Sequence, residues 1–91
     1  MQEPGKNRIT VEIYGQQYRL SGSASVSHMR MIAGYVDDKM NEIGQGNSRL
    51  DTAKIAVLAA VNMADEYVRL KKEYEQLLKI LQADGKGQTG N

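Results

Sequence analysis

The sequence predicts an α+β fold with an N-terminal β-hairpin, one short helix, and one long C-terminal helix that forms an intermolecular coiled coil. Three patterns predict this class. Apolar residues alternate with polar ones over 8–21, recur every three or four residues over 25–43, and follow an unbroken heptad repeat after residue 51. The chain has 91 residues, which is enough for one domain. Because so short a chain buries little surface by itself, association with further copies is expected.

Residues 8–21 are expected to form the hairpin. Ile9, Val11 and Ile13 alternate with polar residues, which is the period of a half-buried strand. Two strands alone are barely stable in water, so the apolar face is expected to lie on a helix. The free strand edges could also pair with another copy.

The hairpin turn is expected at Gly15-Gln16, because a two-residue loop with glycine first suits a type II′ turn. This turn would pair Ile13 with Tyr18 on the apolar face. It would also place Glu12 opposite Arg19 on the other face, so that opposite charges meet. Both faces are satisfied by this one register, which is therefore the predicted one.

Residues 25–43 are expected to form the first helix, capped by Ser25 or Ser27. Gly34 lies inside this helix, where glycine costs about 1 kcal/mol relative to alanine, and we interpret it as a point of close helix contact. A polar, glycine-rich run at 44–47 ends the helix. The apolar stripe consists of Met29, Ile32, Val36, Met40 and Ile43.

The long helix is expected over 51–82, with Ser48 as its cap and Asp51 as the acid of a capping box. We expect residues 1–50 to form a globular head. The first half of the long helix would complete that head and the dimer core, and the second half would form a coiled-coil tail. Residues 83–91 are polar and rich in glycine, so they are expected to be flexible.

Nine residues of the long helix form a heptad seam, in which spacings of three and four alternate. A helix over 51–81 is roughly 46 Å long, whereas a compact globule of this chain length is about 30 Å across. The seam therefore needs a partner helix, and the chain is expected to be an oligomer. The seam residues are Ala53, Ala56, Ala60, Met63, Tyr67, Leu70, Tyr74, Leu77 and Leu81.

Two polar features of the long helix bear on this assembly. In a parallel pair, Glu66 of one chain would face Lys71 of the other, which favours the parallel arrangement. Asn62 lies among apolar residues, and a buried amide requires hydrogen-bond partners. It is expected either to bond to the hairpin or first helix, or to set the register of the dimer.

Composition excludes several classes of function. The net charge is +1, no basic block occurs, and there is no Trp or Phe to stack on bases, so no nucleic-acid partner is expected. There is no cysteine, which removes disulfides and thiolate metal sites. No apolar run is long enough for a membrane span and no signal peptide is recognisable, so a cytoplasmic protein without membrane contact is expected.

The sequence contains no convincing catalytic or metal-binding group. His28 is the single histidine and is expected on the exposed face of the first helix. Asp37 and Asp38 are adjacent, so their side chains point apart, and we expect a solvated face. The Gly44-Gln45-Gly46 run lacks the further glycine and preceding strand of a phosphate loop, and we interpret it as a turn. No catalytic residue, metal, cofactor or small-molecule substrate is expected.

Three segments together resemble the ZapA family of small bacterial proteins that associate with the division protein FtsZ. They are ITVEIYGQQY at 9–18, YVDDKM at 35–40 and LDTAKIAVLAAVNMADE at 50–66, and the third is the most specific. The resemblance covers about residues 7–80. It implies a dimeric head with a coiled-coil tail, and two dimers joined tail to tail as an antiparallel tetramer.

The resemblance further implies that the heads bind FtsZ and bundle its filaments at mid-cell, which promotes Z-ring assembly and stability. Because FtsZ is acidic in general, exposed polar and basic groups near the hairpin turn and the start of the long helix are the expected contacts. These are Gln16, Arg49 and Lys54, with Arg30 and Lys39 on the first helix as second choices.

A second class of function stays open on the sequence. A general coiled-coil adaptor, or a chaperone-like holdase that grips unfolded clients between helices, would carry the same apolar stripe. Such a protein would bind many denatured proteins without nucleotide dependence. An enzyme is the weakest of the three alternatives because no nucleophile–base pair is present.

Overall fold

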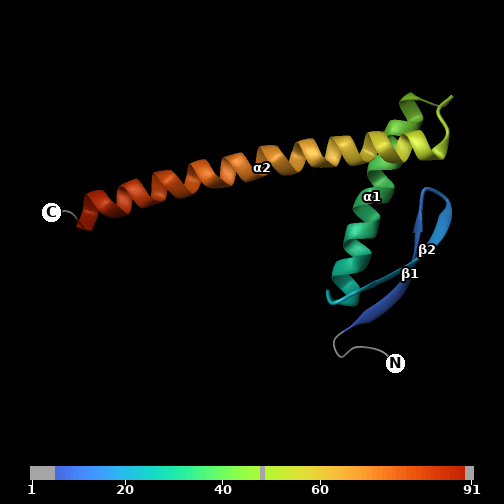
Figure 1. The fold of residues 1–91 in the computed structure, drawn as a ribbon, viewed down its shortest axis with the longest axis horizontal. Coiled ribbons are helices and arrows are strands. Elements are labelled where there is room, and N and C mark those ends of the chain that lie inside the picture. The colour runs from blue at the N-terminus through green and yellow to red at the C-terminus, as the bar shows by residue number, and fades with distance from the viewer. Residues whose placement is uncertain (1–5, 48, 90–91) are drawn as a thin grey trace. The chain divides into compact units, whose positions relative to one another are not determined.

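The computed structural model describes residues 6–47 and 49–89, with side chains up to Ala83. Two antiparallel strands, β1 (Asn7–Ile13) and β2 (Gln16–Gly22), are followed by helices α1 (Val26–Gly46) and α2 (Thr52–Thr89), as Figure 1 shows. The predicted fold class is confirmed. The chain divides into two compact units, the head unit ending at Ala59 and the tail unit beginning at Ala60.

The hairpin has the predicted strands and apolar face but not the predicted register. Val11 pairs with Tyr18, and Ile13 pairs with Gln16, so the pairing of Ile13 with Tyr18 is wrong. Glu12 consequently lies opposite Gln17 and not opposite Arg19. The error is a shift by two residues, which returns every side chain to the same face because the period of a strand is two.

The turn explains this shift, because it lies at Tyr14 and Gly15 and not at Gly15-Gln16. Both residues have positive φ, 50° at Tyr14 and 81° at Gly15, as a type I′ turn requires. Few non-glycine residues adopt this conformation without support. At Tyr14 the support comes from α1: its backbone N–H donates to Asp37 Oδ1 at 2.7 Å.

The ring of Tyr14 packs against Gly44 in the last turns of α1. A Cβ at Gly44 would overlap the Tyr14 hydroxyl, so only glycine leaves room for the ring in this position. Two contacts with α1 therefore hold the turn. The backbone N–H of Tyr14 makes one, with Asp37, and the ring of Tyr14 makes the other, with Gly44. Neither contact is visible in the local sequence of the hairpin.

Helix α1 starts where the sequence indicates and ends later. Ser25 is the N-cap, and its hydroxyl accepts the N–H of His28 at 3.1 Å. The helix continues past the predicted end at residue 43 to Gly46. Asn47 then closes it, because its backbone N–H donates to Gly44 O and its side-chain amide donates to Ile43 O, at 3.2 and 3.0 Å. Among the described residues, nothing lies within 4 Å of a Cβ placed at Gly34, so the predicted close helix contact is not made there by the described part of the chain.

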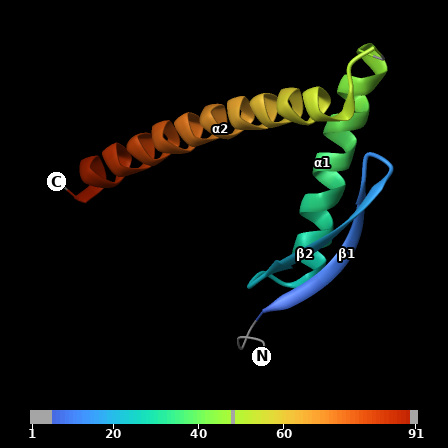
Figure 2. The ribbon, with the colours of Figure 1, turned by 45° about the vertical axis from the view of Figure 1, so that its right-hand side comes forward.

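The core of the head unit consists of two clusters, both built on α1. The hairpin lies along α1 in Figures 1 and 2, and its partly buried Ile13 packs against both clusters. The first cluster joins hairpin and helix through Ile9, Val11, Met29 and Ala33. The second joins α1 to the start of α2 through Met40, Ile55 and Ala59.

Helix α2 begins at Thr52, and Asp51 is its cap, since Asp51 Oδ1 accepts the N–H of Lys54 at 2.9 Å. Asp51 therefore has the role that the sequence assigned to Ser48, which lies outside the described residues. The helix continues to Thr89, beyond the predicted end at residue 82. Each glycine near this end costs about 1 kcal/mol but keeps its N–H donor, so the backbone ladder continues. The flexibility expected for 83–91 stays a prediction.

Candidate functional site

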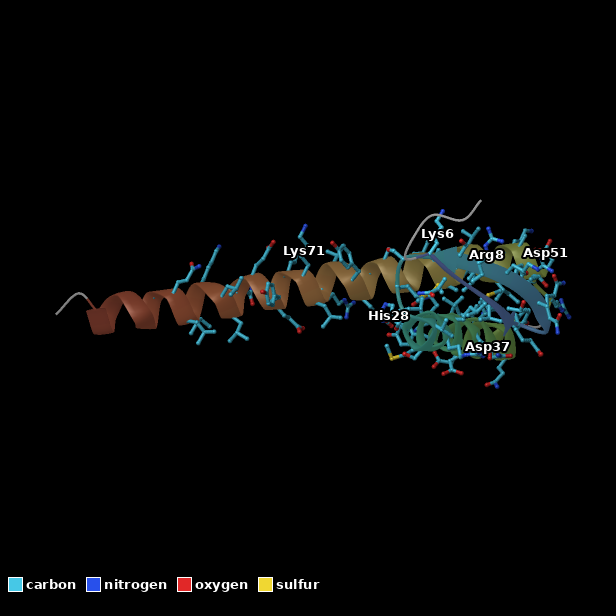
Figure 3. The ribbon with its side chains drawn as sticks, turned by 90° about the horizontal axis from the view of Figure 1, so that it is seen from below. Lys6, Arg8, His28, Asp37, Asp51 and Lys71 are labelled. Carbon is cyan, nitrogen blue, oxygen red and sulfur yellow. The ribbon has the colours of Figure 1, made fainter. Side chains whose placement is uncertain are left out.

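The described side chains include few groups suited to catalysis or metal binding. His28 is exposed on α1, as predicted (Figure 3). Asp38 is exposed as well. Asp37 is half-buried and binds the hairpin turn, so a solvated role for it is wrong. Within residues 6–47 and 49–83, no group of three or more His, Asp or Glu side chains could hold a metal ion. Likewise, no described helix combines the length and apolarity that a bilayer crossing requires.

The heptad seam is the dominant surface of the tail unit. Its large side chains from Tyr67 to Leu81 are between 53% and 64% exposed. Side chains of this type usually lie in a core, and a contiguous apolar stripe on a described surface indicates an interaction site. The seam residues in this unit are Ala60, Met63, Tyr67, Leu70, Tyr74, Leu77 and Leu81.

Polar residues make up much of the remaining surface of the tail helix, beside a few exposed apolar side chains such as Val61 and Val68. Asp65 and Arg69 form an ion pair with 3.0 Å between Oδ2 and Nε, and both side chains are exposed. Such a pair contributes only about 0.3–0.5 kcal/mol, so it favours the helix slightly but does not compensate for the exposed seam. Ile80, beside the seam, is also exposed and widens the apolar stripe near its end.

In the head unit, the first two seam residues border an open hollow. Ala53 and Ala56 line it together with Tyr18 of β2, and Met40 of α1 contributes as well. The hollow has a volume of about 580 Å³ and is mostly apolar in its lining. The small alanine side chains leave this space open, which is consistent with close approach of another backbone.

Three of the predicted head contacts are exposed and come from neighbouring elements. Gln16 is the first residue of β2, and its Oε1 accepts the Tyr18 hydroxyl at 3.4 Å. Gln16 lines the same hollow as Thr52 and Ala53, so the hairpin turn and the start of α2 lie together. Lys54 is exposed in the first turn of α2.

Arg49 is also exposed, in the connection before α2. The structure thus places Gln16 beside the start of α2, which carries Lys54. The connection that carries Arg49 leads directly into this helix. Gln16 lines the hollow with Thr52 and Ala53, whereas Lys54 lies about 200° around α2 from Thr52, so a common contact surface of Gln16, Arg49 and Lys54 stays a prediction.

The two second choices on α1 do not form one surface. Arg30 and Lys39 are nine residues apart, which is two and a half helical turns, so they lie on opposite sides of the helix. Arg30 is exposed. The Lys39 side chain is only 16% exposed, and its Nζ lies 3.9 Å from Glu42 Oε1. Lys39 is thus poorly placed to meet a partner.

Sequence reasoning missed Arg19. Once the register shifts, Arg19 is opposite Thr10 and not paired with Glu12, and it lines hollows on both sides of β2. Its position could have been found only from the register. Asn62, for which burial was expected, is exposed in the single chain.

Comparison with known proteins identifies the family of the chain. The model of the family "Cell division protein ZapA" matches residues 9–87, which is most of the chain. The chain belongs to the ZapA family. Among its relatives is a cell division protein ZapA from Geobacillus sp. (strain WCH70), 52% identical over 81 residues, which are 89% of this chain and 93% of the relative. The ZapA of Bacillus mycoides (strain KBAB4) is 50% identical over 84 residues, 92% of this chain and 94% of that protein.

A solved ZapA structure shares the fold as well. It is a ZapA mutant dimer from Geobacillus stearothermophilus, 46% identical in sequence, with a TM-score of 0.70. The match covers 90% of this chain and 95% of that chain. ZapA proteins are cell division proteins, and this member has their hairpin, short helix and long helix.

Proposed function

We propose that this ZapA-family chain is a non-enzymatic cell-division protein that associates with itself along the seam of α2 and binds FtsZ with its heads. The observation that carries the proposal is the exposed heptad seam from Tyr67 to Leu81. Fully burying a leucine or similar side chain contributes roughly 1.5–3 kcal/mol. Several such side chains on one stripe therefore favour association of helices over exposure.

The proposed assembly is a parallel dimer, and two dimers joined tail to tail form an antiparallel tetramer. The alanines at the start of the seam would allow close approach of two helices near the heads. The added apolar width at Ile80 would let two dimers associate side by side. The dimeric ZapA mutant structure supports the first of these steps.

Bundling of filaments follows from valency. A tetramer of this kind presents heads at both ends, so it can bind two filaments at once. Each head contact can be weak, because binding of one head raises the effective concentration of the next. No bond is made or broken in this mechanism. The protein would therefore act at the mid-cell division site by promoting Z-ring assembly and stability.

The head contact is proposed to involve Gln16, Arg49 and Lys54. Their exposure supports this choice, as does the position of Gln16 beside Thr52 and Ala53 in the first turn of α2. The partial burial of Lys39 speaks against adding it to that surface, and Arg30 lies on the opposite side of α1 from Lys39.

The assembly is tested by placing charges in the seam. Leu77→Glu combined with Leu81→Glu should leave a folded head dimer in sedimentation velocity but abolish bundling of FtsZ polymerised with GTP. The control is Lys72→Glu with Lys79→Glu, because both positions lie opposite the seam in the same part of α2. Undiminished bundling by the seam variant would show that cross-linking through the tail is wrong.

The head contact needs a separate test. Arg49→Glu with Lys54→Glu should weaken co-sedimentation with FtsZ filaments, while sedimentation velocity shows the same oligomer as the unaltered protein. Arg30→Glu is the matched control on α1 and should bind filaments normally. Unchanged binding by the double variant would remove Arg49 and Lys54 from the contact.

The exposed seam also suits a chaperone-like holdase, since a stripe of apolar side chains can hold unfolded clients. The two functions differ in selectivity. A holdase would suppress aggregation of several unrelated denatured proteins, with no need for GTP. Selective binding to polymerised FtsZ, without such suppression, supports the first function.

A further inference from the structure

The outer face of the hairpin, turned away from α1, carries a set of basic and hydroxyl side chains. Arg8 pairs with Ser21 across the strands, and Thr10 pairs with Arg19. All four are exposed, and we refer to them as the outer basic face. They alternate with Ile9 and Leu20, which pack into the core on the other side. Figure 3 shows Arg8 and its neighbour Lys6 on the side of the hairpin away from α1.

The outer basic face borders an open hollow of about 470 Å³. Its lining consists of the two cross-strand pairs just named, together with Ile9 and Leu20 between them. The two arginines are diagonal neighbours within this set. Such neighbours in adjacent strands are about 7–8 Å apart, within joint reach of one extended ligand.

The acidic residue of this face lies at its far end. Glu12 follows Thr10 along the outer side of β1 and is opposite Gln17, next to the turn. Arg8 and Glu12 are thus the two diagonal neighbours of Arg19 on β1, and Arg8 lies at the end of the hairpin away from Glu12. Arg8 already has an interaction within the chain. A guanidinium carries five N–H donors, so a second acceptor can still bind.

We propose that the outer basic face binds an acidic peptide segment in extended conformation, with carboxylates at alternate positions. Residues i and i+2 of an extended chain are about 6.6 Å apart and point to one side, which matches the separation of the two arginines. Arginine binds carboxylates through paired N–H donors. The hydroxyls of Thr10 and Ser21 add donors between the two charged groups.

Two observations favour a peptide over a nucleic acid. The side chains at alternate positions of an extended peptide match the separation of the two arginines on this face. The outer side of the strands carries no aromatic residue on which a base could stack. This surface is distinct from the proposed FtsZ contact at Gln16, Arg49 and Lys54, so either proposal can fail while the other holds.

The test uses a fluorescent peptide of about eight residues, the length of a strand, with aspartate and threonine alternating. Fluorescence anisotropy with the full chain should show binding. The same peptide with asparagine in place of aspartate should bind at least about tenfold more weakly, because the charge-assisted contacts are lost. Equal binding of both peptides would overturn the proposal.

Variants locate the site. Arg8→Gln with Arg19→Gln should weaken binding of the acidic peptide about tenfold. The matched control, Arg30→Gln with Arg69→Gln, removes the same charge from exposed arginines elsewhere in the chain and should stay within about twofold. Equal losses in the two double variants would mean a general charge effect and would overturn the site.

A measurement on the unaltered protein guards against misfolding of a variant. Amide chemical shifts on adding the acidic peptide should change along β1 and β2, and binding should fall as salt rises from about 0.1 to about 1 M. Shifts confined to other elements would contradict the proposal. Tighter binding of single-stranded RNA than of the acidic peptide would also overturn it.

Discussion

The head and tail units differ in what they bury. In the head unit, Ile55 of α2 is 1% exposed and packs against Met40 of α1. Leu70 lies further along the same helix, in the tail unit, and is 64% exposed. Both are aliphatic residues of similar volume. The head unit thus buries apolar side chains in a core of its own, whereas the large apolar side chains of the tail unit are exposed. We therefore expect the stability of the head unit to be a property of one chain, and that of the tail unit to depend on protein concentration.

This difference follows from what each segment can reach. The first turns of α2 lie beside α1 and its Met40, so their apolar residues find cover within the chain. An isolated helix without such cover is marginal in water, because propensity alone contributes little. The tail helix is therefore expected to be stabilised by another copy, which would bury the apolar side chains that are exposed in the single chain.

The largest expected effect concerns Ile55. Ile55→Ala should lower the free energy of unfolding by about 2–5 kcal/mol, because it leaves a cavity in the second core cluster. Leu70→Ala is the matched change in the tail and should cost under about 0.5 kcal/mol at low protein concentration. Urea unfolding followed by circular dichroism measures both.

Concentration sharpens this first comparison. The loss caused by Ile55→Ala should stay constant as protein concentration rises, whereas that of Leu70→Ala should grow, since association stabilises only the bound form. A Leu70→Ala effect that is large and independent of concentration would mean that the tail is covered within its own chain.

A middle-sized effect is expected at Gly44. Gly44→Ala forces the ring of Tyr14 out of place and should cost about 1–3 kcal/mol. Gly34→Ala, in the same helix but with open space around it, should instead raise stability by up to about 1 kcal/mol. Thermal unfolding of both variants checks this contrast.

The double variant Gly44→Ala with Tyr14→Phe provides the control for Gly44, since loss of the hydroxyl relieves the closest overlap and should restore part of the stability. A loss on Gly34→Ala that appears only in the associated protein would place another copy at Gly34. That result would support the close helix contact predicted from the sequence.

The smallest effect is expected at Asp37. Asp37→Ala removes the acceptor of the Tyr14 N–H and should cost about 1–2 kcal/mol, whereas Asp38→Ala, exposed next to it, should change little. Asp37→Asn keeps an acceptor oxygen and should recover most of the loss. Urea unfolding of the three variants tests this order, and equal effects at positions 37 and 38 would contradict a role of Asp37 in the turn.

The elements themselves were predictable because their signals are local. The alternation at Ile9, Val11 and Ile13, the cap at Ser25 and the heptad repeat each lie within one segment, and each element is present in the structure. The ends of the helices were less predictable. Asp51 competed with Ser48 as a cap, and glycines near residue 85 did not stop the backbone of α2.

The candidate surfaces divide in the same way. The seam of the tail was found from periodicity alone, since a helix places residues three and four apart on one side. The surface of the head was not predictable in this way, because the position of Arg19 depends on the hairpin register and the exposure of Lys39 depends on packing. Arg19 lies opposite Thr10 only in the observed hairpin register. The Lys39 side chain is only 16% exposed, which limits its contact with a partner.

The amino-acid sequence by itself determined which face of each element is apolar and that α2 carries an exposed stripe. Only the tertiary structure decided the hairpin register, because a shift by two residues preserves both faces and costs the local sequence little. The contacts of Tyr14 with Asp37 and Gly44 make that choice, and they join residues that are far apart in the chain.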